Sequence, residues 1–127
     1  MAVDSIAIDV MSGDFGPRVV IPATLRFLQQ QKDVSVCLVG DQTIISSLLG
    51  RHAFADRIRI VHASDVIGMN EMPVVALRHK KQSSTHLAVE LLKKGEATAC
   101  ISAGNTGALM AISKRMLGMI EGVDRPA

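Results

Sequence analysis

The chain has 127 residues, of which 48% are hydrophobic and 20% charged, and this length suits one domain and is short for two. Its 14 Lys and Arg residues face 12 Asp and Glu, and the net charge of +2 is too small for a general nucleic-acid binder. Trp and Tyr are absent and three Phe occur, so aromatic platforms for single-stranded bases are nearly excluded. We therefore expect a single packed core and no nucleic-acid partner.

The sequence also argues against a membrane span, secretion and a metal site. Its apolar residues come in short runs, well below the roughly 18 consecutive residues that a span needs. The amino terminus contains Asp4 where a secretory signal would carry Lys or Arg. Cys37 and Cys100 lie in short apolar runs, as expected of reduced core thiols in a cytoplasmic protein. Metal-ligand spacing is lacking among the four histidines, His52, His62, His79 and His86.

Four short runs rich in Val, Ile, Ala and Cys predict strands at residues 5–10, 34–39, 57–62 and 98–102. The first, second and fourth are apolar on both sides, which is typical of strands with helices over both faces. The third alternates Arg and Ile, which predicts an edge or half-exposed strand.

Helical patterns separate the strands and follow the last one. They are predicted from about Pro17 to Lys32, from the N-cap Asp41 to Gly50, from the N-cap Ser84 to Gly95, and over residues 106–117. Because strand and helix alternate, we expect one α/β domain over residues 1–127. Its doubly wound, mainly parallel sheet would form a Rossmann-like three-layer fold with helices on both faces.

Residues 63–82 interrupt this alternation and predict a long loop with one or two helical turns. The loop ends in a basic run that leads to two serines at a helix start. Cations beside a helix N-terminus suit an anion or an acidic protein partner. A charge run of this kind is also typical of a solvated surface. The residues concerned are Arg78, His79, Lys80, Lys81, Ser83 and Ser84.

The loop after the fourth strand is the clearest candidate site, because ligands of open α/β sheets bind at the carboxyl ends of strands. Small residues before a helix start leave backbone N–H groups unpaired at the positive end of the helix dipole, which suits a phosphate or an oxyanion. An equal alternative is a plain N-cap, with glycines that allow tight packing. The spacing matches no dinucleotide or Walker motif, so no cofactor is expected. The loop contains Ser102, Gly104, Asn105, Thr106 and Gly107.

The loop after the first strand carries two acids, Asp9 and Asp14, and two glycines, Gly13 and Gly16. The acids suit a base, a metal ligand or a partner for a hydroxyl, but Asp and Gly after a strand are also ordinary turn residues. We expect the first and fourth strands to open on one cleft, so that the loops of Gly13 and Gly104 face each other.

These stretches are similar to the amino-terminal part of the bacterial phosphate acyltransferase family, the acyl-[acyl-carrier-protein]:phosphate acyltransferases of phospholipid synthesis. The most specific match is Ser-Ala-Gly-Asn-Thr-Gly-Ala at residues 102–108, and the others follow in family order at residues 8–17, 38–41, 76–84 and 125–127. Family members usually read Asp-Ala-Met-Gly-Gly-Asp in the first loop, where this chain has Val10 and Ser12. A serine in left-handed backbone there would cost roughly 1 kcal/mol or more.

The resemblance implies that inorganic phosphate attacks the thioester of a fatty acyl group on acyl carrier protein, giving acyl phosphate and the free carrier thiol. It further implies catalytic roles for Asp9, Asp14 and Asn105, carrier docking by Arg78, Lys80 and Lys81, and a homodimer with at most peripheral contact with the inner face of the cell membrane. The implied phosphate-binding residues are Gly13, Gly16, Ser83, Ser84, Ser102, Gly104, Asn105, Thr106 and Gly107.

Because family chains are much longer, we expect this chain to be the amino-terminal portion of a longer enzyme. Two alternatives stay open at this point. One is a phosphotransacetylase-like reaction with acyl-coenzyme A as the donor. The other is an inactive, truncated binding or structural fragment.

Overall fold

A computed structural model describes residues 4–126 of the chain, and the structural statements below concern these residues. The amino-terminal Met1–Val3 and the last residue of the family match, Ala127, lie outside them.

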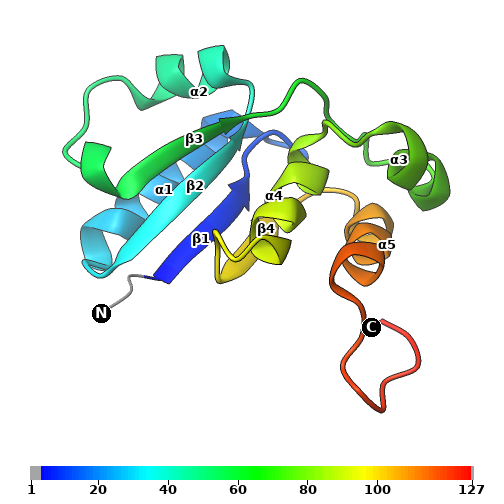
Figure 1. Ribbon diagram of the computed structural model, residues 1–127. Coiled ribbons are helices and arrows are strands. Elements are labelled where there is room, and N and C mark those ends of the chain that lie inside the picture. Colours follow the sequence, from blue (N-terminus) through cyan, green and yellow to red (C-terminus); the bar gives the residue numbers. More distant parts are fainter. Residues whose placement is uncertain (1–3, 127) are drawn as a thin grey trace.

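Four parallel strands form one sheet in the order β3-β2-β1-β4 (Figure 1). Their bounds are β1 Asp4–Asp9, β2 Val34–Gly40, β3 Ile58–His62 and β4 Ala99–Ser102. The helices are α1 Pro17–Gln30, α2 Gln42–Leu49, α3 Pro73–His79, α4 Ser84–Lys93 and α5 Thr106–Leu117, and the 3-10 turn η1 Ala55–Arg57 precedes β3. The predicted α/β class with a parallel sheet and flanking helices is confirmed.

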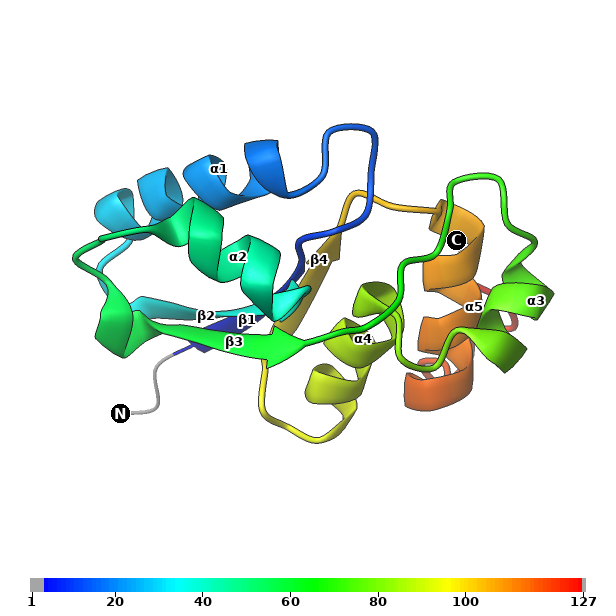
Figure 2. The same cartoon turned by 90° about the horizontal axis from the view of Figure 1, so that it is seen from above.

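Alternation along the strands divides the core between the two faces of the sheet. Ile8 and Val36 pack with buried residues of α1 and α2 on one face, and Ala7 and Cys37 pack with buried residues of α4 on the other. Figure 2 shows α1 and α2 on the side of the sheet opposite α4. The apolar residues of β1 and β2 therefore lie between two helical layers, as their sequence predicts.

Helix boundaries follow the predicted capping residues with one shift. Asp41 accepts from the Ile44 N–H at 3.1 Å, and Gly50 ends α2 with a positive φ of 52°. The N-cap of α4 is Ser83 rather than Ser84, because the Ser83 hydroxyl accepts from the His86 N–H at 3.1 Å. Ser84 is instead the first residue inside the helix.

The order of the strands places a switch point between β1 and β4. The chain proceeds from β1 outward to β2 and β3, and then returns through α4 to β4 on the other side of β1. Ligands of such sheets bind beyond the carboxyl ends of the strands at this point. The loops that follow β1 and β4 are thus the ones that the fold presents to a ligand.

Strand β4 differs from its prediction. Ile101 is 54% exposed, so this strand does not have helices over both of its faces in the described residues. Strand β3, in contrast, lies at the sheet edge with Arg59 exposed, as predicted. The sequence of β4 is as apolar as that of β1. The sequence pattern therefore does not tell a strand with helices over both faces from a strand with one open face.

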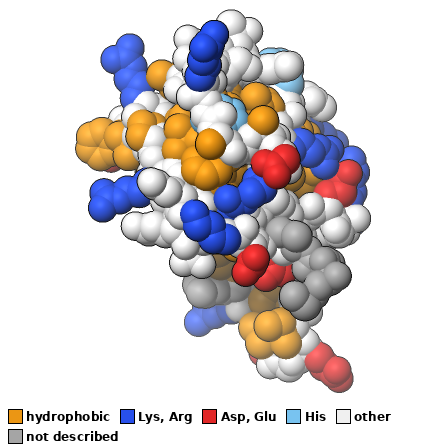
Figure 3. Space-filling view, turned by 90° about the vertical axis from the view of Figure 1, so that its left-hand side faces the viewer, with side chains coloured by type: hydrophobic (Ala, Val, Ile, Leu, Met, Phe, Trp, Pro, Cys, Tyr) orange, Lys and Arg blue, Asp and Glu red, His pale blue; other side chains and the backbone are white. Residues whose placement is uncertain are grey.

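Two surface observations bear on binding to large partners. No helix in residues 4–126 is both long and apolar enough to cross a membrane. On the face drawn in Figure 3, Lys and Arg side chains are scattered around hydrophobic ones, with Asp and Glu between them. This face does not offer the continuous basic surface that a nucleic-acid backbone requires.

Candidate functional site

The loops after β1 and β4 meet at the switch point. Asp9 and Ser102 are partners in the parallel register, so the two loops leave the sheet side by side. Gly13 has a φ of 96°, and a Cβ there would lie 2.9 Å from the Ala103 carbonyl oxygen. A side chain at this position is thus excluded both by backbone conformation and by space. The loops of Gly13 and Gly104 lie against each other, as predicted, and the shared cleft stays a prediction.

The Asp9 carboxylate joins three parts of the fold. It is 1% exposed, and its Oδ2 accepts from the Thr85 hydroxyl at 2.7 Å and from the Ser102 hydroxyl at 2.8 Å. Its Oδ1 accepts from the Ser12 N–H at 3.3 Å. The carboxylate therefore holds the two loops and the first turn of α4 together. Of the roles predicted for Asp9, this geometry matches a partner for hydroxyl groups.

Thr85 was not found from the sequence. It lies 76 positions from Asp9, is 1% exposed, and its hydroxyl is also 3.3 Å from the Ser12 hydroxyl. The one feature of the sequence that could have pointed to Thr85 is its position directly after Ser83 and Ser84. Nothing in the spacing links a threonine at the start of one helix to the end of a distant strand.

Ser12 is not strained. No residue other than glycine has a positive φ in residues 4–126, so the cost expected for a serine in left-handed backbone does not arise. Ser12 is instead buried, and a Cβ added to Gly104 would lie 2.6 Å from the Ser12 Cβ. The Ser12 side chain occupies the space that a side chain at position 104 would otherwise take.

The side chain of Asn105 is fully engaged in local structure. Its Oδ1 accepts from the Ala108 N–H at 3.1 Å and so caps α5. Its Nδ2 donates to the carbonyl oxygens of Gly68 and Glu71, at 3.1 Å and 2.8 Å. These contacts match the alternative in which Asn105 is an N-cap. They also tie α5 to the long loop before α3.

Gly107 has a packing role. A Cβ there would lie 2.7 Å from Cγ of Pro73, so the glycine allows the start of α3 to contact the start of α5. Thr106 and Gly107 are nevertheless exposed, and they are the first two residues of α5. N–H groups at this position have no partner within the helix, and the helix dipole places positive potential beside them. The backbone, rather than the Asn105 side chain, is what this loop offers to an anion.

The predicted contact of Ser83 and Ser84 with an anion is not supported by their position. Both are 0% exposed, and Ser83 is engaged as the N-cap of α4. The Ser84 hydroxyl is buried without a hydrogen-bond partner among the described residues. Ser83 forms a bridge with Asp65, and the Ser84 N–H donates to the Asp65 carbonyl at 3.1 Å, so both buried serines join the start of α4 to this segment and do not line the surface of the candidate site.

The basic run contains one residue with structural contacts, Lys80, and three exposed residues. The Lys80 ammonium forms ion pairs with Asp65 at 3.2 Å and Glu71 at 3.6 Å. Its hydrogen bond with Asp65 is the main cause that raises the pKa of Lys80 above its usual value. Lys80 therefore fastens the loop that Asn105 also holds, whereas Arg78, His79 and Lys81 are exposed.

The remaining predicted residues lie in the β1–α1 loop. Gly16 is the N-cap residue of α1 and has a φ of 59°, a conformation that favours glycine. Asp14 is exposed on the same loop, between Gly13 at the switch point and Gly16 at the helix start. The structure thus keeps Asp14 near the site but gives it none of the contacts that fix Asp9.

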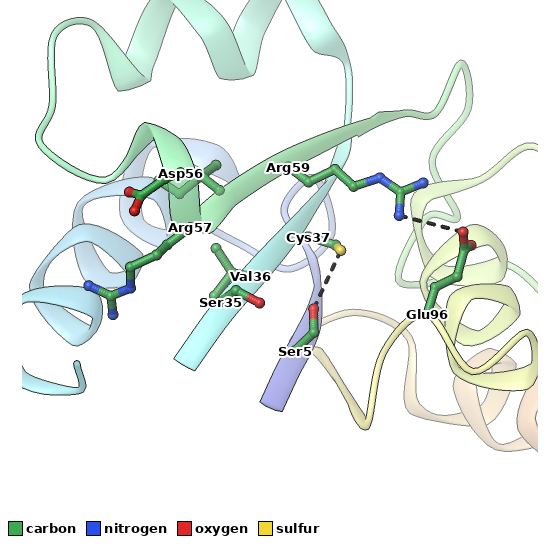
Figure 4. Close-up of a pocket in the computed structure, with 9 residues that line it drawn as sticks. Ser5, Ser35, Val36, Cys37, Asp56, Arg57, Arg59 and Glu96 are labelled. Atoms are coloured by element: carbon green, nitrogen blue, oxygen red, sulfur yellow. Dashed lines mark hydrogen bonds and ion pairs between the residues drawn. The ribbon is translucent and has the colours of Figure 1, made fainter. Parts of the chain in front are cut away.

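Two other groups lie apart from this solvent-facing surface. A cavity of about 300 Å³ at the amino ends of β1 and β2 is lined by the Arg59–Glu96 ion pair and by Ser5 and Cys37, which contact each other (Figure 4).

Burial, together with the negative charge of Asp9, raises the pKa of the Cys100 thiol to about 11, so this thiol is protonated at neutral pH. Within residues 4–126, no three His, Cys, Asp or Glu side chains gather as a metal site would require.

The fold and these loops define a doubly wound α/β protein with its ligand loops at the switch point. The model of the family described as fatty acid synthesis protein matches residues 5–127, and the chain therefore belongs to this family.

Relatives named phosphate acyltransferase confirm the resemblance found in the sequence. The protein of Methylococcus capsulatus is 50% identical over 125 residues, which are 97% of this chain and 37% of that protein. The protein of Shewanella woodyi is also 50% identical, over 97% of this chain and 36% of its own length. The protein of Aeromonas salmonicida is 47% identical over 100% of this chain and 38% of its own length. The chain spans slightly more than a third of the length of these relatives.

Proposed function

We propose that the chain forms the phosphate-holding part of a phosphate acyltransferase, which transfers a fatty acyl group from acyl carrier protein to inorganic phosphate. The observation that carries this proposal is the Asp9 network, which holds the β1 and β4 loops together beside the exposed start of α5. The names of the relatives support the reaction class. A cytoplasmic location, a homodimer and peripheral membrane contact stay predictions.

The proposed reaction places few chemical demands on the protein. A phosphate oxygen attacks the thioester carbonyl carbon, the carbon–sulfur bond breaks, and the carrier leaves as a thiolate that takes up a proton. Phosphate is itself the nucleophile, so the protein needs to hold and orient it and to stabilise charge on the carbonyl oxygen. The N–H groups of Thr106 and Gly107 at the N-terminus of a helix of 12 residues suit the first task.

Removal of one backbone N–H tests this assignment. Thr106→Pro deletes the N–H at the first position of α5, where proline is tolerated, and Asn105 already has the extended conformation that a following proline needs (φ −62°, ψ 109°). Thr106→Ala is the matched control, because it keeps the N–H. We expect the proline variant to raise the KM for phosphate about 10- to 100-fold relative to the alanine variant, as a lost hydrogen bond to a charged group implies.

The assay uses an extended chain, in which residues 1–127 are joined to the remaining portion of the Methylococcus capsulatus relative. Acyl phosphate formation is measured with palmitoyl-[acyl-carrier-protein] and with acetyl-coenzyme A, and circular dichroism confirms folding. Equal phosphate KM values for the two variants would contradict the assignment of the N–H group. Faster turnover of acetyl-coenzyme A would favour the phosphotransacetylase-like alternative. A folded but inactive chain would favour a binding or structural role.

Carrier docking is proposed for Arg78 and Lys81, without Lys80. Replacing both by Glu in the extended chain is expected to slow association with acyl carrier protein at least about tenfold at low salt, and the effect should shrink as salt screens the exposed charges. Lys93→Glu with Lys114→Glu changes the net charge equally at other exposed positions. Stopped-flow association rates check the prediction, and equal slowing by both pairs would mean that only net charge matters.

A further inference from the structure

A turn in the long loop between β3 and α3 lies against the start of α5. The turn covers residues 68–71, and the Glu71 N–H closes it by donating to the Gly68 carbonyl at 3.2 Å. The carbonyl oxygens of Gly68 and Glu71 both accept from Nδ2 of Asn105. Helix α3 begins two residues later and lies beside α5 (Figure 2). The turn is thus the part of the loop that reaches the residue capping α5.

The side chain of Glu71 fixes this turn. Its Oε2 accepts from the Gly68 N–H, and its Oε1 lies 3.6 Å from the Lys80 ammonium. Lys80 is itself the C-cap residue of α3, and its ammonium also donates to the Val66 carbonyl at 3.2 Å. The Glu71 carboxylate therefore joins the turn to the end of α3, so the turn cannot shift without breaking one of these contacts.

Asn105 transmits the position of the turn to α5. An amide side chain carries an oxygen acceptor and a nitrogen donor, so the two carbonyls of the turn determine which of them faces the helix. With Nδ2 on the turn, Oδ1 accepts from the Ala108 N–H at 3.1 Å. Pro73, at the start of α3, adds a second contact, because its Cγ lies 2.7 Å from where a Cβ at Gly107 would be. Both contacts hold the first turn of α5.

We infer that Glu71 is a positioning residue for the start of α5, where the N–H groups of Thr106 and Gly107 hold phosphate. The Glu71 carboxylate fixes the turn, the turn orients the Asn105 amide, and this amide caps the helix. Sequence patterns assign Glu71 no role, because it lies 34 positions from Asn105. The inference rests on the proposed function, whereas the contacts that carry it do not depend on any ligand.

Glu71→Ala in the extended chain tests this role. We expect the KM for phosphate to rise at least about fivefold while kcat changes less than about twofold, because the substitution loosens groups that bind phosphate without removing a reacting group. Glu71→Gln keeps an oxygen that can accept from the Gly68 N–H, and its KM should stay within about threefold of the unmodified value. Glu90→Ala is the matched control. It removes a similar ion pair, with Lys94 at 3.7 Å on α4, and should change neither constant.

Hydrogen exchange of the 127-residue chain gives a readout that needs no activity. The Ala108 amide should exchange at least about tenfold faster in Glu71→Ala than in the unmodified chain, because its acceptor on Asn105 is no longer held in place. The Ile44 amide, whose acceptor is the Asp41 carboxylate at the start of α2, is the internal reference and should not change. Equal acceleration of both amides would indicate general destabilisation and would overturn the inference, as would an unchanged Ala108 amide.

The kinetic outcomes separate this inference from the proposed function. If Glu71→Ala leaves the phosphate KM unchanged while Thr106→Pro raises it, Glu71 has no positioning role and the proposed function stands. If neither variant changes the KM, the assignment of phosphate to the start of α5 fails, and the inference fails with it. A strong fall in kcat at an unchanged KM would also contradict the inference, because it would place Glu71 among the groups that take part in the reaction itself.

Discussion

Gly104→Ala is expected to destabilise the chain by about 1–3 kcal/mol, the usual cost of adding a methyl group to a filled site. The new Cβ would lie 2.6 Å from the Ser12 Cβ, and Ser12 is buried between Gly104 and Thr85, where it has little room to move. Urea unfolding of both proteins measures the loss. The two nearest atoms, Cβ at 2.6 Å and Oγ at 3.1 Å, both belong to Ser12, and the Ser102 Oγ follows at 3.3 Å, so the contact predicts which second substitution restores most of the stability.

Ser12→Gly removes both of these Ser12 atoms. Alone it should cost about 0.5–1.5 kcal/mol, because it removes the hydroxyl contact with Thr85. In the Ser12→Gly background, however, Gly104→Ala should cost at least about 1 kcal/mol less than in the unmodified chain. Independent effects of the two substitutions, additive within about 0.5 kcal/mol, would show that the loops do not pack as described. Gly13→Ala serves as a comparison, because its positive φ remains unfavourable whichever residue occupies position 12.

The layout of the fold was predictable because its signals are local. Short apolar runs mark the strands, and Asp41 and Gly50 bound α2 through contacts with residues that are close in sequence. The rule that parallel strands carry ligands at their carboxyl ends then selects the loops of Gly13 and Gly104 without any knowledge of contacts. These loops do lie against each other.

The roles of individual side chains were less predictable, because they depend on distant partners. Asn105 is a polar residue in a loop by sequence, but its partners at Gly68 and Glu71 are set by how the long loop returns to α5. Lys80 resembles its exposed neighbours until Asp65 and Glu71 are placed beside it. A pattern identifies residue types at a site, whereas the fold decides which of them remain available to a ligand.

The partners of Asp9 on α4 and β4 are also distant in sequence, and replacing Asp9 is expected to have a large effect on stability. Asp9→Asn retains the size of the side chain but removes the charge that accepts from Thr85, Ser102 and the Ser12 N–H. We expect a loss of about 2–4 kcal/mol in the free energy of unfolding, since hydrogen bonds to a buried charged group are stronger than neutral ones.

A double-mutant cycle separates the network from a general effect of burial. Thr85→Val keeps the shape of the side chain and removes the hydroxyl 2.7 Å from the Asp9 carboxylate, whereas Thr85→Ser keeps the hydroxyl and should retain most of the stability. The double variant should lose about 1–2 kcal/mol less unfolding free energy than the sum of the losses of Asp9→Asn and Thr85→Val, as expected for residues in direct contact. Additive losses would mean that the two residues act separately.

The same variants distinguish positioning from direct catalysis. If Asp9 orients the loops, Thr85→Val in the extended chain should raise the KM for phosphate at least about fivefold, because both loops lose a common anchor. Thr85→Ser should restore most of that affinity, and neither variant should change the pH dependence of kcat. A kcat that falls strongly with an unchanged KM, together with a shifted pH profile, would instead place the Asp9 carboxylate among the groups that exchange a proton during the reaction.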